Sequence, residues 1–399
     1  MTGSRRVIAF INAGHVMDHM FMLIFPTAVL GMQSTFARPY GELIALAFGG
    51  FVAFGVGSIP AGWLGDRWSR RNMMAVFFIG IGAASFTTGL AQSTTQLAAG
   101  LIAIGLFGAI YHPVGTAMLV SHAERVGREL GINGVWGNLG VAFAALVTGA
   151  ITQWLGWRYA FMIPGVVAIA TGLLFLVLIP AEANRAANRA ARRGAIFPRD
   201  VIVRAFLVLA LVTIAGGVVF NSTTVALPKL IDERLPQLAG STFGVGVLVC
   251  IIYVVGAMSQ LIMGRVIDRY PLKVGFVAIA LMQAPFVAAT AFATGWATVF
   301  AAVGMVFAIF GQVTFNDGMV ARYATDEWRS RVYALRYFLS FGVSAVAIQL
   351  VAFMHEHGGF KALLEILSLC SVVVLIGAAL FPYRRDEIES VMPAVQPAE

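Results

Sequence analysis

The sequence carries little charge, since Asp, Glu, Lys and Arg make up only 12% of its 399 residues, against about 25% in an average soluble domain. So few charges cannot cover the surface of a water-soluble chain, which excludes the soluble, disordered and fibrous classes. Its two cysteines, Cys250 and Cys370, lie in apolar runs and exclude a disulfide framework or a cysteine-based metal site. Apolar residues make up 59%, enough for roughly a dozen membrane-spanning helices of ~20 residues.

Apolar runs follow one another along the chain, separated by charged breaks or breaks that contain Gly and Pro. Each run can cross a bilayer once, so we predict an all-α polytopic membrane protein with 12 transmembrane helices. The longest break holds five arginines among alanines and could form a short amphipathic helix on the membrane surface. The runs lie at 7–31, 41–64, 73–91, 95–120, 130–153, 158–180, 203–230, 242–264, 272–293, 296–320, 332–354 and 359–382.

The longest break also predicts the domain boundaries. A six-helix bundle at 1–180 is followed by a cytoplasmic basic linker at 181–203, a second six-helix bundle at 204–385 and a cytoplasmic tail at 386–399. With the N-terminus in the cytoplasm, 22 of the 27 Lys and Arg residues fall on the cytoplasmic side, which is the positive-inside pattern. We therefore expect a multi-pass protein of the cytoplasmic (inner) membrane with both termini cytoplasmic. The net charge of +8 then reflects orientation, and no nucleic-acid partner is expected.

The chain contains an internal repeat. A Gly-x-x-x-Asp-Arg pattern begins at Gly62, between the second and third runs, and recurs 202 residues later at Gly264. Pro26 and Pro228 are separated by the same 202 residues. Two equal offsets at half the chain length predict a duplicated six-helix unit. Parallel repeats of this kind place a substrate site between the halves, near the bilayer midplane.

Six plus six helices, a basic linker and the charged pattern after Gly62 resemble the major facilitator superfamily, as does the stretch 156–161 (Gly-Trp-Arg-Tyr-Ala-Phe) before the sixth helix. The resemblance implies two pseudo-symmetric six-helix bundles, with helices one, four, seven and ten lining a central cavity. A carboxylate that faces arginines of the next segment makes a charge-assisted pair, which can latch the halves in one state and release them in another. The predicted latch comprises Gly62, Asp66, Arg67, Arg70, Arg71, Asp268 and Arg269.

Ionisable residues inside the predicted helices are the first candidates for function, because such groups are costly in a membrane. His15, Asp18, His19 and Met22 are spaced i, i+3, i+4 and i+7 and share one helical face. His112, in the fourth run, lies at a depth similar to that of His15, counting ~1.5 Å per residue. Since the resemblance places helices one and four at the cavity, these residues can meet across it.

Three functions suit this cluster, beside a purely structural role in helix–helix hydrogen bonding. A carboxylate next to histidines can couple transport to protons. Protonated histidines can instead bind an anionic substrate. The third option is a transition-metal site, because His15 and His19 have the spacing of two ligands on a helix and His112 could be a third.

Within the superfamily, the sequence locally resembles the fosmidomycin-resistance group of exporters. The matching residues are His15 and Asp18 in helix one, the Tyr-His-Pro of 111–113 in helix four and the Gly-Asn-Leu-Gly of 137–140 in helix five. Val114 departs from that pattern, in which a glutamate often follows His-Pro, so one proton or cation site of that group is absent here.

Further polar, aromatic and glycine residues invite predictions, although most amides in membrane helices serve packing. Asp317 and Arg336 lie near the cytoplasmic ends of their helices and are predicted either to pair or to extend to the membrane surface, in a gating role. In helix five, four glycines at three-residue intervals from Gly131 to Gly140 predict a close-packing stripe. The candidate substrate contacts are Met22, Tyr111, Trp136, Asn138, Asn221, Tyr253, Gln260, Gln312 and Asn316.

The sequence has no phosphate-binding Gly-Lys-Ser/Thr loop, no ATPase domain and no nucleophile constellation. We therefore expect no enzyme activity, no cofactor, and transport driven by an ion gradient, most simply of protons. The predicted function is secondary active transport of a small organic solute, anionic or drug-like, by alternating access, and the resemblance to exporters implies efflux. A transition-metal transporter and a non-transporting receptor on the same scaffold are the alternatives. The expected partners are the solute and the lipid bilayer, with the chain acting as a monomer.

Overall fold

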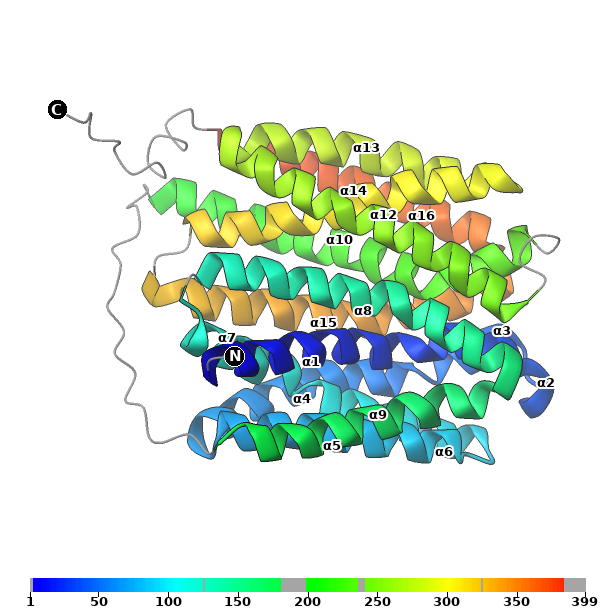
Figure 1. The fold of residues 1–399 in the computed structure, drawn as a ribbon. Helices are drawn as coiled ribbons and strands as arrows, with labels where there is room; N and C mark the ends of the chain where they lie inside the picture. The colour runs from blue at the N-terminus through cyan, green and yellow to red at the C-terminus, as the bar shows by residue number, and fades with distance from the viewer. Residues whose placement is uncertain (1–2, 125, 181–198, 236–240, 324–325, 384–399) are drawn as a thin grey trace.

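The protein is a bundle of long helices that run side by side, as seen in a computed structural model (Figure 1). The structure describes residues 3–124, 126–180, 199–235, 241–323 and 326–383. Within these residues, 12 helical segments are long and apolar enough to cross a membrane, which confirms the predicted fold class. The elements are α1 (Gly3–Ala28), η1 (Val29–Gly31), α2 (Gln33–Phe36), α3 (Tyr40–Ala45), α4 (Phe48–Arg67), α5 (Arg70–Gly89), α6 (Thr94–Gly108), η2 (Tyr111–Gly115), α7 (Thr116–His122), α8 (Val126–Leu155), α9 (Trp157–Leu178), α10 (Arg199–Arg234), α12 (Thr242–Arg269), α13 (Leu272–Phe292), α14 (Trp296–Tyr323), α15 (Asp326–His357) and α16 (Gly359–Leu380).

Serine side chains begin several of these helices. Ser69, Ser93 and Ser241 accept hydrogen bonds from backbone N–H groups three residues further on, at 3.2, 3.2 and 3.0 Å. Each bond satisfies one of the N–H groups that a helix leaves unpaired at its start. These caps place the first residue of α5, α6 and α12, and so fix where the apolar part of each span begins.

The helices form two halves, α1 to α9 and α10 to α16. The seam between them consists mainly of α8 against α12 and α4 against α15. In each contact, the fifth span of one half packs against the second span of the other half: α8 against α12, and α15 against α4. The two contacts are therefore equivalent under the pseudo-symmetry that relates the halves. The duplication predicted from the 202-residue offset is therefore visible in the packing.

The described chain begins and ends at the same end of the bundle (Figure 1). Helix α10 starts at Arg199, inside the stretch predicted as a linker. The rest of that linker up to residue 198, with its predicted amphipathic helix, and the tail at 386–399 lie outside the described residues.

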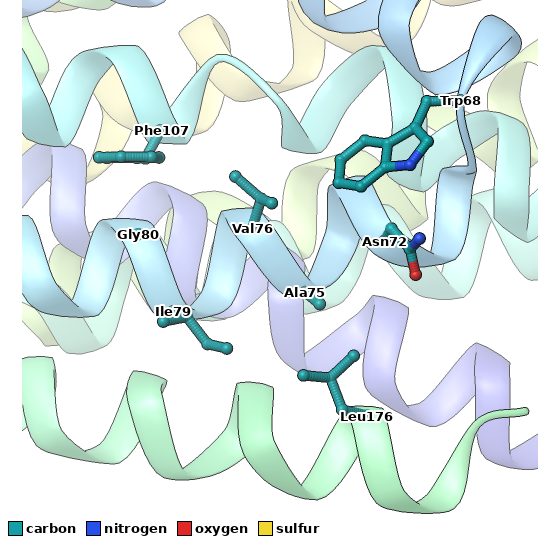
Figure 2. A pocket seen from close by; sticks show the side chains of 8 residues that line it. All are labelled: Trp68, Asn72, Ala75, Val76, Ile79, Gly80, Phe107 and Leu176. Atoms are coloured by element: carbon teal, nitrogen blue, oxygen red, sulfur yellow. The ribbon is translucent and has the colours of Figure 1, made fainter. Parts of the chain in front are cut away.

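An apolar groove of about 420 Å³ lies on the outside of the first half, between α5, α6 and α9 (Figure 2). Helices α5 and α9 stand at the edge of the bundle remote from the second half (Figure 1). The groove is thus separate from the polar residues that the sequence placed in the interior.

Candidate functional site

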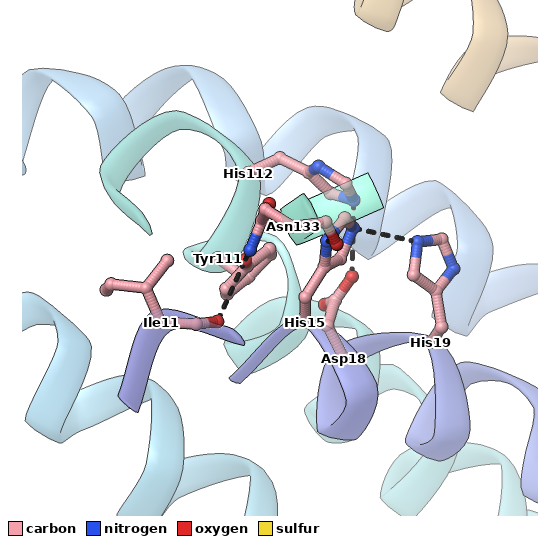
Figure 3. A network of polar contacts seen from close by, with 7 residues as sticks. All are labelled: Ile11, His15, Asp18, His19, Tyr111, His112 and Asn133. Carbon is pink, nitrogen blue, oxygen red and sulfur yellow. Dashed lines mark hydrogen bonds and ion pairs between the residues drawn. The ribbon is translucent and has the colours of Figure 1, made fainter. Parts of the chain in front are cut away.

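The predicted ionisable residues of helices one and four come together inside the first half (Figure 3). Nε2 of His112, on η2, lies 3.2 Å from Oδ2 of Asp18 on α1. Nε2 of His19 lies 3.2 Å from Nε2 of His15, one turn earlier on α1. One ring nitrogen from each of the three histidines lies within 4.8 Å of the other two. The four residues form one site, which we call the His–Asp cluster.

The hydrogen-bond partner of His15 fixes which ring nitrogen carries its proton. Nδ1 of His15 lies 2.7 Å from the backbone carbonyl oxygen of Asn133 on α8. A carbonyl oxygen only accepts, so Nδ1 is the donor. In the neutral ring, Nε2 then has the lone pair and accepts from the N–H of His19. The nitrogen of His15 that faces the cluster is therefore the acceptor of the hydrogen bond from His19.

A buried polar network, which the sequence did not predict, holds the ring of His15 in place. Nδ2 of Asn133 donates to Oδ1 of Asn12 at 2.9 Å and to the hydroxyl of Tyr111 at 3.0 Å. That hydroxyl also donates to the carbonyl of Ile11 at 3.0 Å, and the Tyr111 ring stacks on His15 with centroids 4.9 Å apart. Tyr111, predicted as a substrate contact, thus supports the cluster from behind. The one available signal was that Asn12 lies three residues before His15, on the same face of the helix.

The fourth span changes its helical form at the cluster. Tyr111–Gly115 form a π-helix between α6 and α7, where Pro113 has no N–H for a regular α-helical bond. Short π-turns of this kind are frequent at functional sites. Two glycines of α4 face this turn: a Cβ on Gly62 would lie 3.2 Å from Pro113, and one on Gly65 would lie 2.8 Å from Val114. Gly62 and Gly65 therefore let α4 approach closely the turn that carries His112.

The side of the His–Asp cluster that faces α4 is apolar. Asp18 has no exposed surface, and the ring of Phe54 on α4 meets His112 edge-on with centroids 6.1 Å apart. A buried carboxylate is costly unless it is paired, so Asp18 and His112 stabilise each other. Among the described residues, the three converging ring nitrogens of the cluster are also the only group of His, Cys, Asp or Glu side chains close enough together to hold a metal ion.

The predicted contacts of the first half serve several purposes. Nδ2 of Asn138 on α8 donates to Oε1 of Gln260 on α12, so these two predicted residues meet across the seam between the halves. Trp136 is 42% exposed, and Met22 packs against the apolar core one turn after His19.

Three predicted contacts of the second half, Asn221, Tyr253 and Gln312, bond to backbone carbonyls of their own half. Asn221 donates to the carbonyl of Gly217 at 2.9 Å, and the hydroxyl of Tyr253 donates to that of Thr224 at 2.9 Å. Gln312 reaches a carbonyl of α10 at 3.3 Å, while Asn316 is buried one turn further along α14. These contacts give the residues a packing role; their contact with substrate stays a prediction.

The loop between α4 and α5 contains the first copy of the predicted latch. Arg70 donates to Oδ1 of Asp66 at 2.7 Å, and Arg71 donates to two carbonyls at the end of α9, at 2.6 and 2.7 Å. The guanidinium of Arg67 lies over an indole ring of α4. All of these partners belong to the first half. The side chains at the start of α15, on the other side of the seam, lie outside the described residues.

The second copy of the Gly-x-x-x-Asp-Arg pattern lies at the end of α12. The side chain of Asp268 lies outside the described set, and Arg269 is exposed.

Asp317 on α14 and Arg336 on α15 form an ion pair, as the sequence predicted from their positions.

At the end of the bundle remote from Gly3, aromatic and charged residues join the two halves. Nε2 of His355 on α15 lies 2.8 Å from Oε1 of Glu233 on α10, and its ring packs against Tyr40 on α3 with centroids 4.7 Å apart. Nearby, a Cβ on Gly149 of α8 would lie only 2.3 Å from the carbonyl oxygen of Thr242 on α12. This end of the seam is closed by direct contact between the halves.

Comparison with known proteins places this fold in a family. The family model of the Major Facilitator Superfamily matches residues 11–259, so the chain belongs to that superfamily. A puromycin resistance protein of Streptomyces alboniger is 30% identical over 166 residues, 41% of this chain and 31% of the relative. A chloramphenicol efflux pump of Mycobacterium tuberculosis is 27% identical over 236 residues, 57% of this chain and 55% of the pump. The chain thus spans between about a third and about half of the length of these relatives.

Solved structures share the whole architecture. A bacterial homologue of the human lysosomal transporter Spinster matches with a TM-score of 0.78 and 13% identity over 94% of this chain and 96% of that chain. A D-xylose–proton symporter matches with a TM-score of 0.75 and 14% identity over 94% and 97%. At these identities the likeness concerns the fold, and it covers both halves. The local resemblance to the fosmidomycin-resistance group stays a prediction.

Proposed function

We propose that the protein is a proton-coupled secondary transporter that moves a small organic solute across the membrane by alternating access. The observation that carries this proposal is the contact of Asp18 with His112, 3.2 Å apart and buried in an apolar bundle, with His15 and His19 beside it. Ionisable groups at such depth in membrane helices mark ion and substrate paths. Nothing in the arrangement requires enzyme chemistry or a cofactor.

The cluster can link a proton to a change of state. While Asp18 is ionised, it holds protonated His112 against α1 and so ties the π-turn to the first helix. A proton on Asp18 removes that attraction and releases His112, which can then meet an acidic or acceptor group of the solute. When Asp18 releases its proton on the other side of the membrane, the Asp18–His112 pair forms again. The transport cycle then depends on which side the cluster faces when the proton leaves.

The membrane orientation follows from the charge bias. With 22 of the 27 Lys and Arg residues on one side, both termini are cytoplasmic, and the closed end of the seam near Tyr40 faces outward. We propose a monomer in the cytoplasmic (inner) membrane. Its relatives include puromycin and tetracenomycin C resistance proteins and a chloramphenicol efflux pump, so these drug classes, with fosmidomycin as an anionic probe, are the first solutes to test for efflux.

The decisive experiment replaces Asp18 with Asn in proteoliposomes. For a solute that the unaltered protein accumulates in response to a pH gradient, Asp18→Asn should abolish the driven accumulation but keep solute exchange at zero gradient. Glu42→Gln is the matched control, because Glu42 is an exposed carboxylate paired with Arg38 at 2.9 Å, and it should retain both activities. Undiminished driven transport by Asp18→Asn would show that Asp18 is not the coupling group.

A transition-metal substrate is the second candidate, because three histidine nitrogens converge within 4.8 Å and the donor bond of His15 to a carbonyl resembles the outer-shell support of metal ligands. Elemental analysis of cells with and without the protein separates the two functions. Changed zinc, nickel or copper content that reverts in a His19→Ala variant supports metal transport, whereas unchanged content and unchanged metal tolerance exclude it.

A further inference from the structure

The hydrogen bonds of the His–Asp cluster have a direction that follows from one fixed partner. The backbone carbonyl of Asn133 only accepts, so Nδ1 of His15 carries a proton and Nε2 of a neutral His15 carries a lone pair. The 3.2 Å bond between the two Nε2 atoms then requires a proton on Nε2 of His19. In a neutral His19 ring, the remaining lone pair is therefore on Nδ1.

The charge balance of the cluster keeps both of these rings neutral. Its one carboxylate, Asp18, has no exposed surface and lies 3.2 Å from Nε2 of His112, so the charge of Asp18 is balanced by a proton on that ring. A further imidazolium among three ring nitrogens within 4.8 Å of one another would have no counter-ion inside the membrane, which is costly. His15 and His19 are therefore neutral while the Asp18–His112 pair is formed.

The lone pair on Nδ1 of His19 is accessible from outside the cluster. Figure 3 shows this nitrogen on the side of the ring turned away from His15. Within the part of the chain that the structure describes, it has no hydrogen-bond partner, and the ring is only partly buried. Nδ1 of His355, by comparison, is unpaired but sealed inside the protein. The cluster thus presents one free hydrogen-bond acceptor, next to a histidine whose two ring nitrogens are both engaged.

We propose that Nδ1 of His19 binds the solute by accepting a hydrogen bond from it, so that the solute must carry a donor: a hydroxyl, an amide N–H or an ammonium group. This inference rests on the proposed transport function and names the substrate class of the same site. An ionised carboxylate only accepts hydrogen bonds and cannot bind this nitrogen.

The second histidine of the site completes the substrate class. Once Asp18 is protonated, the released His112 offers a donor to an acceptor group of the same solute. A neutral or cationic solute that carries both a donor and an acceptor therefore fits the cluster. A solute whose polar groups are all anionic does not fit.

The first test reads the protonation of the rings in the protein without solute. When histidine is isotopically labelled at its ring nitrogens, nitrogen NMR of the protein in nanodiscs near neutral pH separates N–H from bare nitrogens, and His19→Gln assigns the signals of His19 by their loss. His19 should carry its proton on Nε2 alone. In His15→Phe, which lacks the acceptor, the other tautomer should appear. A proton on Nδ1 of His19 in the unaltered protein would overturn the proposal.

The second test compares two solutes that differ in their donors. Chloramphenicol has hydroxyl groups and an amide N–H, whereas its fully methylated derivative has O-methyl and N-methyl groups in their place and cannot donate. Equilibrium dialysis in detergent should show about 5-fold tighter binding of chloramphenicol, for one hydrogen bond. His19→Phe should abolish this preference. His357→Phe, the same change at an exposed histidine of α15, is the matched control and should retain it.

The outcomes separate this inference from the proposed function. Equal binding of the two solutes by the unaltered protein, binding of neither, or a preference that survives in His19→Phe would each rule out the acceptor role of His19. Neither measurement uses a proton gradient. Absence of gradient-driven accumulation in a protein that still prefers the donor would therefore contradict the proton coupling and leave the acceptor role standing.

Discussion

At the scale of single residues, the functional argument depends on Asp18 and the three histidines around it. Their helical spacing and depth were enough to predict that they meet, and the 3.2 Å contact between Asp18 and His112 agrees. The residues that hold His15 were missed. Asn12 shares the helical face of His15, but Asn133 lies on another helix, and the bond from His15 to Asn133 joins residues 118 positions apart.

The stability of the network around His15 leads to the first prediction at this scale. Asn133→Ala removes the bonds to Asn12 and Tyr111 and leaves both partners buried, so the free energy of unfolding should fall by about 1–2 kcal/mol. Denaturant unfolding in detergent micelles measures this change. Val135→Ala, two residues on at a 37% exposed position, should change it little. A loss no greater for Asn133→Ala than for Val135→Ala would contradict the assigned role.

At the scale of elements, the glycines of α8 show how helix geometry limits pattern reading. A three-residue interval advances 300° around a helix of 3.6 residues per turn, so a stripe with this period drifts around the axis. Cβ atoms on Gly137 and Gly140 would lie 2.6 Å from the ring of His15 and 2.4 Å from the carbonyl of Val16, whereas Gly131 and Gly134 have open space. The prediction of one continuous close-packing stripe is therefore wrong for Gly131 and Gly134.

This difference predicts opposite effects of the same substitution within one helix. Gly140→Ala forces α8 away from the α1 backbone and should cost about 1–3 kcal/mol of unfolding free energy. Gly134→Ala meets nothing within 4 Å and should stabilise the helix by about 0.5–1 kcal/mol. Thermal unfolding of the two variants in detergent decides the matter. Equal changes in the melting temperature of the two variants would mean that α1 and α8 do not approach closely at Gly140.

At the scale of the whole molecule, the two halves must separate at the end near Tyr40 for the cavity to open there. The described contacts at that end include the bond from the Thr242 backbone N–H to Oε1 of Gln153, at 3.0 Å across the α8–α12 seam. The proposed alternating access requires this seam to part in each cycle. A covalent link across it should therefore arrest transport without harming the fold.

This prediction can be tested with cysteines. In a background with Cys250 and Cys370 replaced by Ser, Gln153→Cys with Thr242→Cys should lose solute counterflow after treatment with a short disulfide-forming cross-linker, and regain it with reductant. The matched control is Arg38→Cys with Glu42→Cys, a pair one turn apart within the first half, whose cross-link should have no effect. Full counterflow in the cross-linked seam variant would rule out opening at this end.

The sequence by itself determined the number of spans, the duplicated halves and the shared face of His15, Asp18 and His19. A bilayer accepts little except helices of ~20 apolar residues, so hydropathy counts them, and residues within two turns of one helix have fixed relative positions. Only the tertiary structure decided which side chains of other helices reach that face. The π-turn around His112 and the bond to the carbonyl of Asn133 depend on packing distances between helices, which no spacing within a single helix contains.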